Sequence, residues 1–496
     1  VQTMQKLPPL APRSNRWTLS ALTFAALLAA APLAQAADCF WTGGTGDWGV
    51  AANWDCGRAA GAADDAFMTN NDDVLRLSGG SAAVRSMYLS GGRLDISGGA
   101  VLSTTSDMAG QVVWIGDFFF NWAREPRADL RVTGTGSLWQ AQWSSIVVGN
   151  GATGAVTVDS GGEVSIRNLS FVLGTNGGNG TLAIGALPGQ PPAAPGTVTG
   201  SNPGVIELGE DARSTGRLVF NHTNTGDYAF TRNLTGYHGE LLHLAGVTRL
   251  KPDADSAVAG HIFTGSARVT GATLVLNSGL FVARADTANG IDGGITVESG
   301  GTLAGEATVG DANGKFATPI TVQAGGTLIP GTLNSASGTL TVAEGGVTAQ
   351  AGATLRFGLD NADNSRLAAA GPIDLGGATL ALELAPGFAP AAGQQWTLVD
   401  NTGAAPVQGR FAQGTTISLP GYAFEIDYAG GDGNDVVLKL VAAPAPGGGG
   451  RVAAVPTLGE WSLLLLGLLA AGLGARRLRR AGWRAAGGRS GAREGG

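Results

Sequence analysis

A short unit recurs along this chain: an apolar, often β-branched triplet, a turn with two consecutive glycines, and a second short apolar segment. The copies begin at Leu94, Val156, Ile295, Ile320, Leu340 and Ile373. In Ile320-Thr321-Val322 the first and third side chains share one face of an extended strand, while the threonine points to the other face. No unit can bury that apolar pair by itself, so the units must stack on one another.

The spacing of the units indicates a solenoid. The copies at Ile295, Ile320 and Leu340 lie 25 and 20 residues apart, and we interpret each interval as one coil. The paired glycines would supply the positive φ values and close approaches that sharp corners need. The sequence therefore predicts an all-β protein whose body, residues 61–442, is a single-stranded right-handed parallel β-helix. Tandem antiparallel β-sandwiches are the alternative, because hairpins use the same Gly-Gly turns.

The first residues read as a secretion signal. If Met4 is the start, Lys6, Arg13 and Arg16 form a basic region, and an apolar stretch follows from residue 19 to 31. Ala34-Gln35-Ala36 fits the small-x-small cleavage pattern. We expect residues 1–37 to be a signal peptide and the mature chain to begin near Asp38.

Composition restricts the partners of the mature chain. With 82 glycines among 496 residues, 44% hydrophobic and 14% charged residues, the chain is too apolar for a disordered linker and too glycine-rich for a helical bundle. Between residues 38 and 450 there are 20 Lys or Arg against 36 Asp or Glu, a net charge of −16. An acidic exterior argues against nucleic acid as a partner.

The two cysteines, Cys39 and Cys56, lie at the start of the mature chain. In an oxidising compartment a disulfide is favoured over a metal site, which would need further ligands. The segment around the cysteines contains Trp41, Trp48 and Asn53-Trp54, and this opening resembles the first turn of autotransporter-like β-helix proteins. We expect residues 38–60 to form a disulfide- and Trp-containing cap over the open end of the strand stack.

The C-terminal end has the layout of a membrane segment. The predicted span, 458–475, contains a single charge, Glu460, and 18 helical residues extend about 27 Å, which is close to the hydrocarbon thickness of a bilayer. A basic tail, 476–496, follows. The arginines expected to hold that tail in the cytoplasm are Arg476, Arg477, Arg479 and Arg480. A Pro/Gly linker, 443–454, separates the span from the body.

This tail, residues 455–496, resembles the IPTL-CTERM sorting signal, a relative of the PEP-CTERM tails of Gram-negative bacteria. The motif, 455–461, includes Val455, Pro456, Thr457, Leu458 and Trp461. Val455 stands where the family usually has isoleucine. The resemblance implies an exosortase-like enzyme as partner, cleavage near the motif, and export through an inner-membrane-tethered intermediate to the cell surface or medium. Residues 326–440 also resemble the C-terminal part of autotransporter passenger-type β-helices, which implies final coils and a hairpin-like cap.

Residues that could carry chemistry are sparse, and we assign no catalytic residue and no cofactor. Residues 430–438 match one calcium-binding nonapeptide with Asp432 and Asp435, but such sites need tandem copies, and a glycine-rich turn explains the segment better. His238, Glu240 and His243 lack the spacing of zinc proteases. We expect these histidines to face solvent or to be partly packed.

Paired acids do not indicate a glycosidase either. Neighbouring residues in a strand point to opposite faces, so neither Asp64-Asp65 nor Asp72-Asp73 forms a catalytic carboxylate pair by itself, and we place both doublets in loops. The G-x-S-x-G sequence of serine hydrolases is absent.

Two functions follow from these observations. The first is a non-catalytic, exported protein that binds an extracellular glycan or protein in adhesion, matrix or envelope interactions. The second is a secreted carbohydrate-active enzyme on the same scaffold, because a fold does not determine an activity. A groove on one face, lined by convergent carboxylates, basic residues and stacked aromatic rings, would favour the enzyme.

Overall fold

The computed structural model describes residues 36–105, 112–118, 126–142, 145–167, 170–201, 205–252, 260–277, 279–311, 317–333 and 335–443. Of the predicted signal peptide, only Ala36 and Ala37 belong to these ranges, and of the predicted linker only Ala443. The predicted sorting tail lies outside them. In the described ranges the only helix is the three-residue 3-10 helix η1 (Ala51–Asn53), and no helix there has the length and apolarity needed to cross a bilayer.

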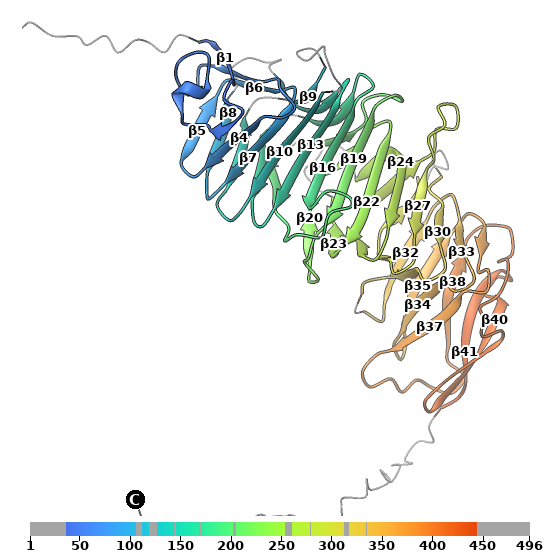
Figure 1. Ribbon diagram of the computed structural model, residues 1–496. Coiled ribbons are helices and arrows are strands. Elements are labelled where there is room, and N and C mark those ends of the chain that lie inside the picture. The colour runs from blue at the N-terminus through green and yellow to red at the C-terminus, as the bar shows by residue number, and fades with distance from the viewer. Residues whose placement is uncertain are drawn as a thin grey trace, which may run out of the picture.

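The described chain is a parallel β-helix. Strands of successive coils pair in parallel and form three faces along an elongated stack, with the two ends of the described chain at opposite ends (Figure 1). Among the named strands, antiparallel pairing joins only β38 to β41, β39 to β40 and β40 to β41, at the C-terminal end. The predicted all-β parallel architecture is confirmed, and tandem antiparallel sandwiches are excluded.

Face 1 carries the first strand of each coil. Its N-terminal sheet runs through β1 (Asp38–Phe40), β3 (Asp65–Met68), β6 (Ser86–Leu89), β9 (Val112–Asp117), β12 (Ser145–Asn150), β15 (Phe171–Thr175), β18 (Ile206–Leu208) and β21 (Leu234–Thr235). It continues through β24 (His261–Val269), β26 (Leu280–Arg284), β29 (Thr308–Val309), β32 (Gly338–Val342), β35 (Ser365–Ala369) and β38 (Gln395–Asn401).

Face 2 is continuous from end to end. Its strands are β2 (Thr45–Asp47), β4 (Val74–Ser78), β7 (Gly92–Ser97), β10 (Arg127–Thr133), β13 (Thr153–Asp159), β16 (Asn179–Gly185), β19 (Thr215–Asn221), β22 (Gly239–Ala245), β24, β27 (Gly294–Val297), β30 (Ile320–Val322), β33 (Val347–Ala349) and β36 (Ile373–Asp374). The long strand β24 serves two faces, because its first half pairs with β26 and its second half pairs with β22 and β27.

Face 3 consists of a five-stranded and a seven-stranded sheet. The first contains β5 (Ser81–Val84), β8 (Val101–Thr105), β11 (Leu138–Gln142), β14 (Glu163–Arg167) and β17 (Thr197–Ser201). The second contains β20 (Tyr228–Phe230), β23 (Val247–Leu250), β25 (Thr273–Leu276), β28 (Thr302–Gly305), β31 (Thr327–Pro330), β34 (Thr354–Leu359) and β37 (Thr379–Leu384). The C-terminal antiparallel strands are β39 (Thr416–Leu419), β40 (Tyr422–Gly430) and β41 (Asp435–Ala442).

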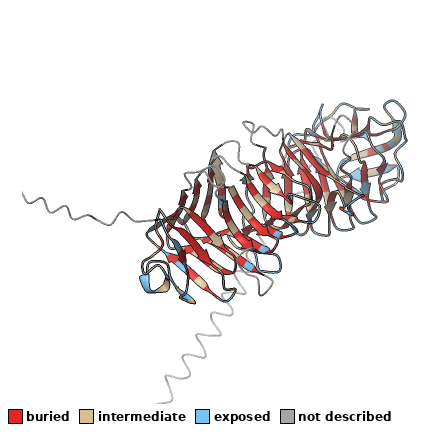
Figure 2. Cartoon of the chain, turned by 90° about the horizontal axis from the view of Figure 1, so that it is seen from above, coloured by how far each residue is buried: buried red, intermediate tan, exposed pale blue. Residues whose placement is uncertain are grey.

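Register between coils aligns the buried side chains. On face 2, Leu130 pairs with Leu94 of the preceding coil and with Val156 of the following coil. The same ladder continues through Leu182, Leu218, Leu241, Ala267, Ile295, Ile320, Val347 and Ile373. All of these side chains are at most 2% exposed, and the buried bands follow the strands through the stack (Figure 2). Burying each valine, leucine or isoleucine side chain of this ladder contributes about 1.5–3 kcal/mol, which holds neighbouring coils together.

The two positions of the repeated turn require glycine for different structural reasons. In the unit that begins at Ile295, Gly300 has a φ of +76°, which most side chains disfavour. Gly301 does not need that conformation, but a Cβ atom there would lie 2.3 Å from the carbonyl oxygen of Val269 in the preceding coil. The first glycine therefore permits the turn, and the second permits the coils to approach.

One predicted coil is wrong. Ile320 pairs with Val347 in the next coil, 27 residues later, and Leu340 instead lies in β32 on face 1, where it pairs with Leu367. The other copies place their Gly-Gly turn between faces 2 and 3, whereas the copy at Leu340 places it between faces 1 and 2. The same local pattern serves two different corners, so the 20-residue spacing does not measure a coil.

Candidate functional site

Two of the predicted groups fall outside the described residues. They are the sorting motif (Val455, Pro456, Thr457, Leu458 and Trp461) and the basic stop (Arg476, Arg477, Arg479 and Arg480).

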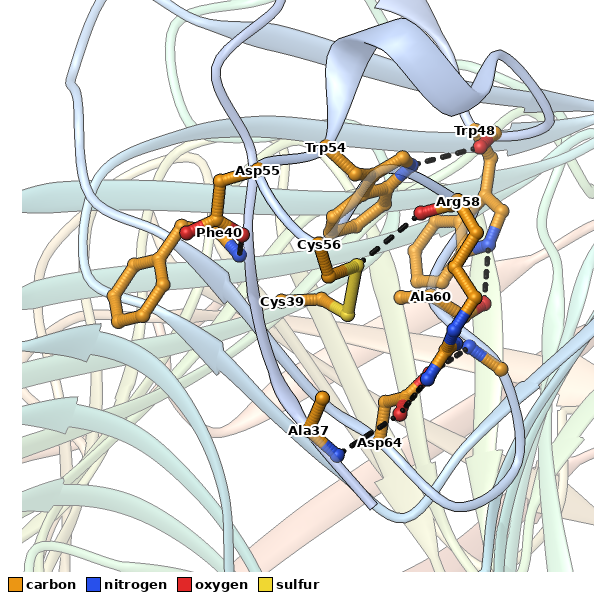
Figure 3. Close-up of polar contacts among 11 residues, drawn as sticks. Ala37, Cys39, Phe40, Trp48, Trp54, Asp55, Cys56, Arg58, Ala60 and Asp64 are labelled. Atoms are coloured by element: carbon orange, nitrogen blue, oxygen red, sulfur yellow. Dashed lines mark hydrogen bonds and ion pairs between the residues drawn. A yellow bond between two sulfur atoms is a disulfide. The ribbon is translucent and has the colours of Figure 1, made fainter. Parts of the chain in front are cut away.

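The N-terminal segment 38–60 contains a disulfide between Cys39 and Cys56, whose Cα atoms are 5.2 Å apart (Figure 3). Two buried tryptophans flank it: Trp48 donates to the carbonyl of Ala60 at 3.2 Å, and Trp54 donates to the carbonyl of Trp48 at 2.9 Å. The segment also supplies β1 and β2, which pair in parallel with β3 and β4. It thus forms the first coil of the stack.

The first acidic doublet is structural. Asp64 is fully buried and accepts hydrogen bonds from Arg58 and from the backbone of Gly61 and Ala37 (Figure 3). The hydrogen bond from Arg58 is the main reason that the pKa of Asp64 lies below its usual value. Asp65 begins β3, rather than lying in a loop as predicted, and accepts a hydrogen bond from Arg85 at 2.9 Å.

The structure gives no support to Asp432 and Asp435 as calcium ligands. Asp432 lies in the turn between β40 and β41, and Asp435 begins β41 and accepts the backbone N–H of Asn401 at 2.9 Å. Within the ranges that the structure describes, no group of three or more His, Cys, Asp or Glu side chains is placed to hold a metal ion.

The histidines differ from our expectation. His243 is fully buried, because the alternation of β22 turns it inward together with Leu241. His222 and His261 are also buried, and Nε2 of His222 lies 2.8 Å from Oγ1 of Thr248. Only His238 is partly packed as predicted. The three buried histidines belong to the core and are inaccessible to a ligand.

A groove does occur on the outside of face 2, in the N-terminal third of the chain. A cavity of about 490 Å³ lies where β4, β7, β10 and β13 begin, and its polar lining includes Asp72, Asp73, Arg93, Arg127 and Asp129. A second cavity, of about 320 Å³, shares Arg93, Arg127 and Asp129 with the first. Arg131, Asp159 and Gln190 are among the further polar residues that line it. Because three residues line both cavities, we treat the two cavities as one feature, the face-2 groove.

Strand register brings these charges together from different coils. Leu130 points into the core, so Asp129 and Arg131 on either side of it point outward. Asp129 is the register partner of Arg93, and Arg131 is the register partner of Asp95. Arg93 donates to Asp95 at 2.6 Å, Arg131 donates to Asp159 at 2.6 Å, and Arg127 lies 3.7 Å from Asp129. Acidic and basic side chains therefore alternate along this part of face 2.

The pKa values of two carboxylates in the groove are shifted in opposite directions. Burial raises the pKa of Asp129, and the neighbouring Asp95 adds to this effect, against the opposing charges of Arg127 and Arg93. Oδ1 of Asp129 is buried and has no hydrogen-bond partner among the described residues. Burial would also raise the pKa of Asp159, but hydrogen bonds from Arg131 and Thr133 outweigh it and hold the pKa below its usual value.

An ordered loop, residues 186–196, forms one wall of the groove. It connects β16 to β17, where the equivalent turn one coil earlier needs only residues 160–162. The amide of Asn221 donates to the carbonyls of Leu187 and Gln190 at 3.2 and 3.0 Å, and Ser160 and Gly161 donate backbone hydrogen bonds to Ala194 and Pro195. The loop is thereby fixed against the next and the preceding coil.

The groove combines hydrogen-bonding groups of both charges with partial burial, which suits the recognition of a polar ligand. It meets two of the three conditions stated above for an enzyme, since it has carboxylates and basic residues, but no described aromatic ring lines either cavity. Sequence analysis missed Arg93, Asp129 and Arg131. Each is an ordinary outward-facing strand residue, and only the register between coils reveals that they converge.

Comparison with known proteins gives one family match. Residues 453–480 match the IPTL-CTERM motif, as the resemblance of the tail predicts. No curated protein matches the chain. Among solved structures, the crystal structure of the Haemophilus influenzae Hap adhesin aligns with a TM-score of 0.31 and 14% identity, over 76% of this chain and 40% of that chain. This chain thus spans less than half of the adhesin's length, and the fold assignment rests on the strand pairings, not on this likeness.

Proposed function

We propose that the IPTL-CTERM motif delivers this chain to the outside of its cell, and that the β-helix acts there as a non-catalytic surface protein in adhesion, matrix or envelope interactions. An exosortase-like enzyme would cleave near the motif after the tail has held the protein in the inner membrane. The body would then remain on the surface or be released.

The motif match at residues 453–480 carries this proposal. It begins shortly after β41, the last strand of the body, so the motif lies close in sequence to the end of the folded domain. A role in contact rather than catalysis is supported by the buried histidines His222, His243 and His261, which lie in the core, where a substrate cannot reach them.

The test is to express the full chain in a Gram-negative cell that carries the matching sorting enzyme, and to determine the C-terminus of the surface fraction by mass spectrometry. We expect the wild-type protein to end near the motif. Pro456→Ala should retain the tail and accumulate in the inner membrane, whereas Pro446→Ala, in the linker, should be processed normally. A surface protein with the arginines intact would indicate a permanent membrane anchor, and unprocessed protein found only in the cytosol would overturn the proposal.

A secreted carbohydrate-active enzyme is the second candidate, and one observation favours it. The raised pKa of Asp129 and the proximity of Asp95 resemble a general acid beside a second carboxylate. If the mature protein releases new reducing ends from a polysaccharide, and Asp129→Asn abolishes this release, the enzyme replaces the non-catalytic proposal.

A further inference from the structure

We infer that the face-2 groove binds a neutral, hydroxyl-rich glycan chain that lies along the axis of the β-helix. This inference rests on the proposed function, since only an exported protein would meet such a polymer outside the cell.

The shape of the groove fits a linear ligand. It begins beside the first residues of β4, continues over β7, β10 and β13, and ends against the loop 186–196. Neighbouring strands lie about 4.8 Å apart, so the outward side chains repeat at that interval along the axis. A polymer of small, identical units can meet equivalent groups on successive coils, whereas a compact ligand would contact only one of them.

The charges of the groove favour a neutral ligand. Arg93, Arg127 and Arg131 line it together with Asp72, Asp73, Asp129 and Asp159, so acidic and basic groups nearly balance. Arg131 is already bound to Asp159 through two hydrogen bonds, and Arg93 is bound to Asp95. A polyanion would have to displace these carboxylates, while a neutral hydroxyl can bind beside them.

Two groups are poised to bind hydroxyls. Asp129 lines both cavities and its side chain is 31% exposed, so a sugar hydroxyl can donate a hydrogen bond to its carboxylate. Arg127 is 65% exposed, and its Nη2 lies 3.7 Å from Asp129, which is beyond hydrogen-bond distance. Its guanidinium can therefore turn toward a ligand without breaking a hydrogen bond to Asp129.

Hydrogen bonds from a buried side chain hold the wall of the groove in place. The side chain of Asn221, which is 3% exposed, uses both of its amide hydrogen bonds on the loop 186–196. This arrangement holds Gln190 at the edge of the cavity, where its amide is available as a further polar contact. A rigid wall reduces the entropy that binding would otherwise cost.

The inference is tested by isothermal titration calorimetry of the mature protein with cellohexaose, mannohexaose and laminarihexaose, and with a heparin hexasaccharide as the polyanion. We expect at least one neutral hexasaccharide to bind, with little dependence on salt concentration, and heparin to bind more weakly. Asp129→Ala should weaken that binding tenfold or more. Arg268→Ala, on the same face but outside the groove, should not change it, and circular dichroism should show both variants folded.

Several results would overturn the inference: no binding of any neutral hexasaccharide at millimolar concentration, preferential binding of heparin, or unchanged affinity in Asp129→Ala. Each of these leaves the proposed surface location intact, because the location is tested separately by fractionation. Conversely, protein confined to the cytosol would refute the proposed function whatever the calorimetry shows. Release of shortened chains would support the glycan site but replace binding by catalysis.

Discussion

His243 lies directly against Phe220 in the core of the β-helix: the two residues are register partners on β22 and β19, and their ring centroids are 5.7 Å apart. Val269 occupies the same position in the next coil. Both ring nitrogens of His243 lack a hydrogen-bond partner among the described residues. A neutral imidazole can fill this apolar position, but a charged imidazolium would be strongly disfavoured there.

Acidification is therefore expected to destabilise the protein. Burial lowers the pKa of His222 to about 4, of His243 to about 3 and of His261 to about 4, from an ordinary value of 6.5. Between about pH 6.5 and these lowered values, the unfolded chain binds more protons than the folded one, so the free energy of unfolding falls as pH falls. Between pH 7.5 and 5 we expect a loss of about 2 kcal/mol for each histidine, measured by urea denaturation.

Substitution separates this effect from general weakening of the core. His243→Leu should make the pH dependence less steep and should raise stability at neutral pH by about 1 kcal/mol, because it removes two buried unpaired nitrogens. Phe220→Leu, in the adjacent coil, should lower stability by about 1–2 kcal/mol at every pH and leave the slope unchanged. An unaltered slope in His243→Leu would contradict the assignment.

The inward ladder of face 2 should dominate the stability of the coils. Ile320 is fully buried, whereas its neighbour Thr321 points outward and is half-buried. We expect Ile320→Ala to cost about 2–5 kcal/mol, because it leaves a cavity between coils. Thr321→Ala should cost less than about 1 kcal/mol. Denaturant titration followed by the β-sheet signal in circular dichroism measures both, and equal effects would be inconsistent with the observed register.

Removal of the disulfide should loosen the N-terminal coil first. Cys39 and Cys56 are separated by 17 positions, and closing a loop of that size contributes about 3 kcal/mol. The double variant Cys39→Ser/Cys56→Ser should expose Trp41, Trp48 and Trp54 to solvent at lower denaturant than the wild type, as a red shift in fluorescence. The β-sheet signal of the body should change later. Simultaneous loss of both signals would show that the first coil and the body unfold as one unit.

The two turn glycines should respond differently to substitution. Gly301→Ala places a Cβ atom 2.3 Å from the carbonyl oxygen of Val269, so the coils must separate locally, at an expected cost of about 1–3 kcal/mol. Gly300→Asn should be tolerated better, because asparagine adopts positive φ more readily than other residues with side chains. Thermal denaturation of the two variants side by side provides the measurement, and the reverse order of stability would refute the distinction.

Local pattern predicted the strands and turns of this fold, but not the length of its coils. The triplets at Val156, Ile295 and Ile320 have the alternation that the structure shows. The local pattern does not predict coil length, because the turns between faces can contain loops of different lengths. Leu75 and Leu94 are register partners 19 residues apart, whereas Leu94 and Leu130 are register partners 36 residues apart. For the same reason the prediction that Ile320 and Leu340 are one coil apart is wrong, since Ile320 pairs with Val347 and Leu340 pairs with Leu367.

The groove could not be predicted for a related reason. Arg93 and Asp129 are distant in sequence, and their proximity depends on the register between β7 and β10. His243 is a different case: we expect it from the sequence to face solvent or to be partly packed, whereas β22 turns its position into the core. The Cys39–Cys56 pair and the C-terminal motif were recognisable from sequence because neither depends on coil length.

The last strand, β41, ends at Ala442, and it lies at the opposite end of the stack from β4, β7 and β10, which carry the groove (Figure 1). Ten strand spacings separate β9 from β38 along face 1, a distance of about 50 Å. A molecule that is anchored in a membrane by its tail would thus hold the groove at the end of the β-helix that lies farther from that membrane. Adding or deleting a coil between them would change how far the protein reaches while leaving the chemistry of recognition untouched.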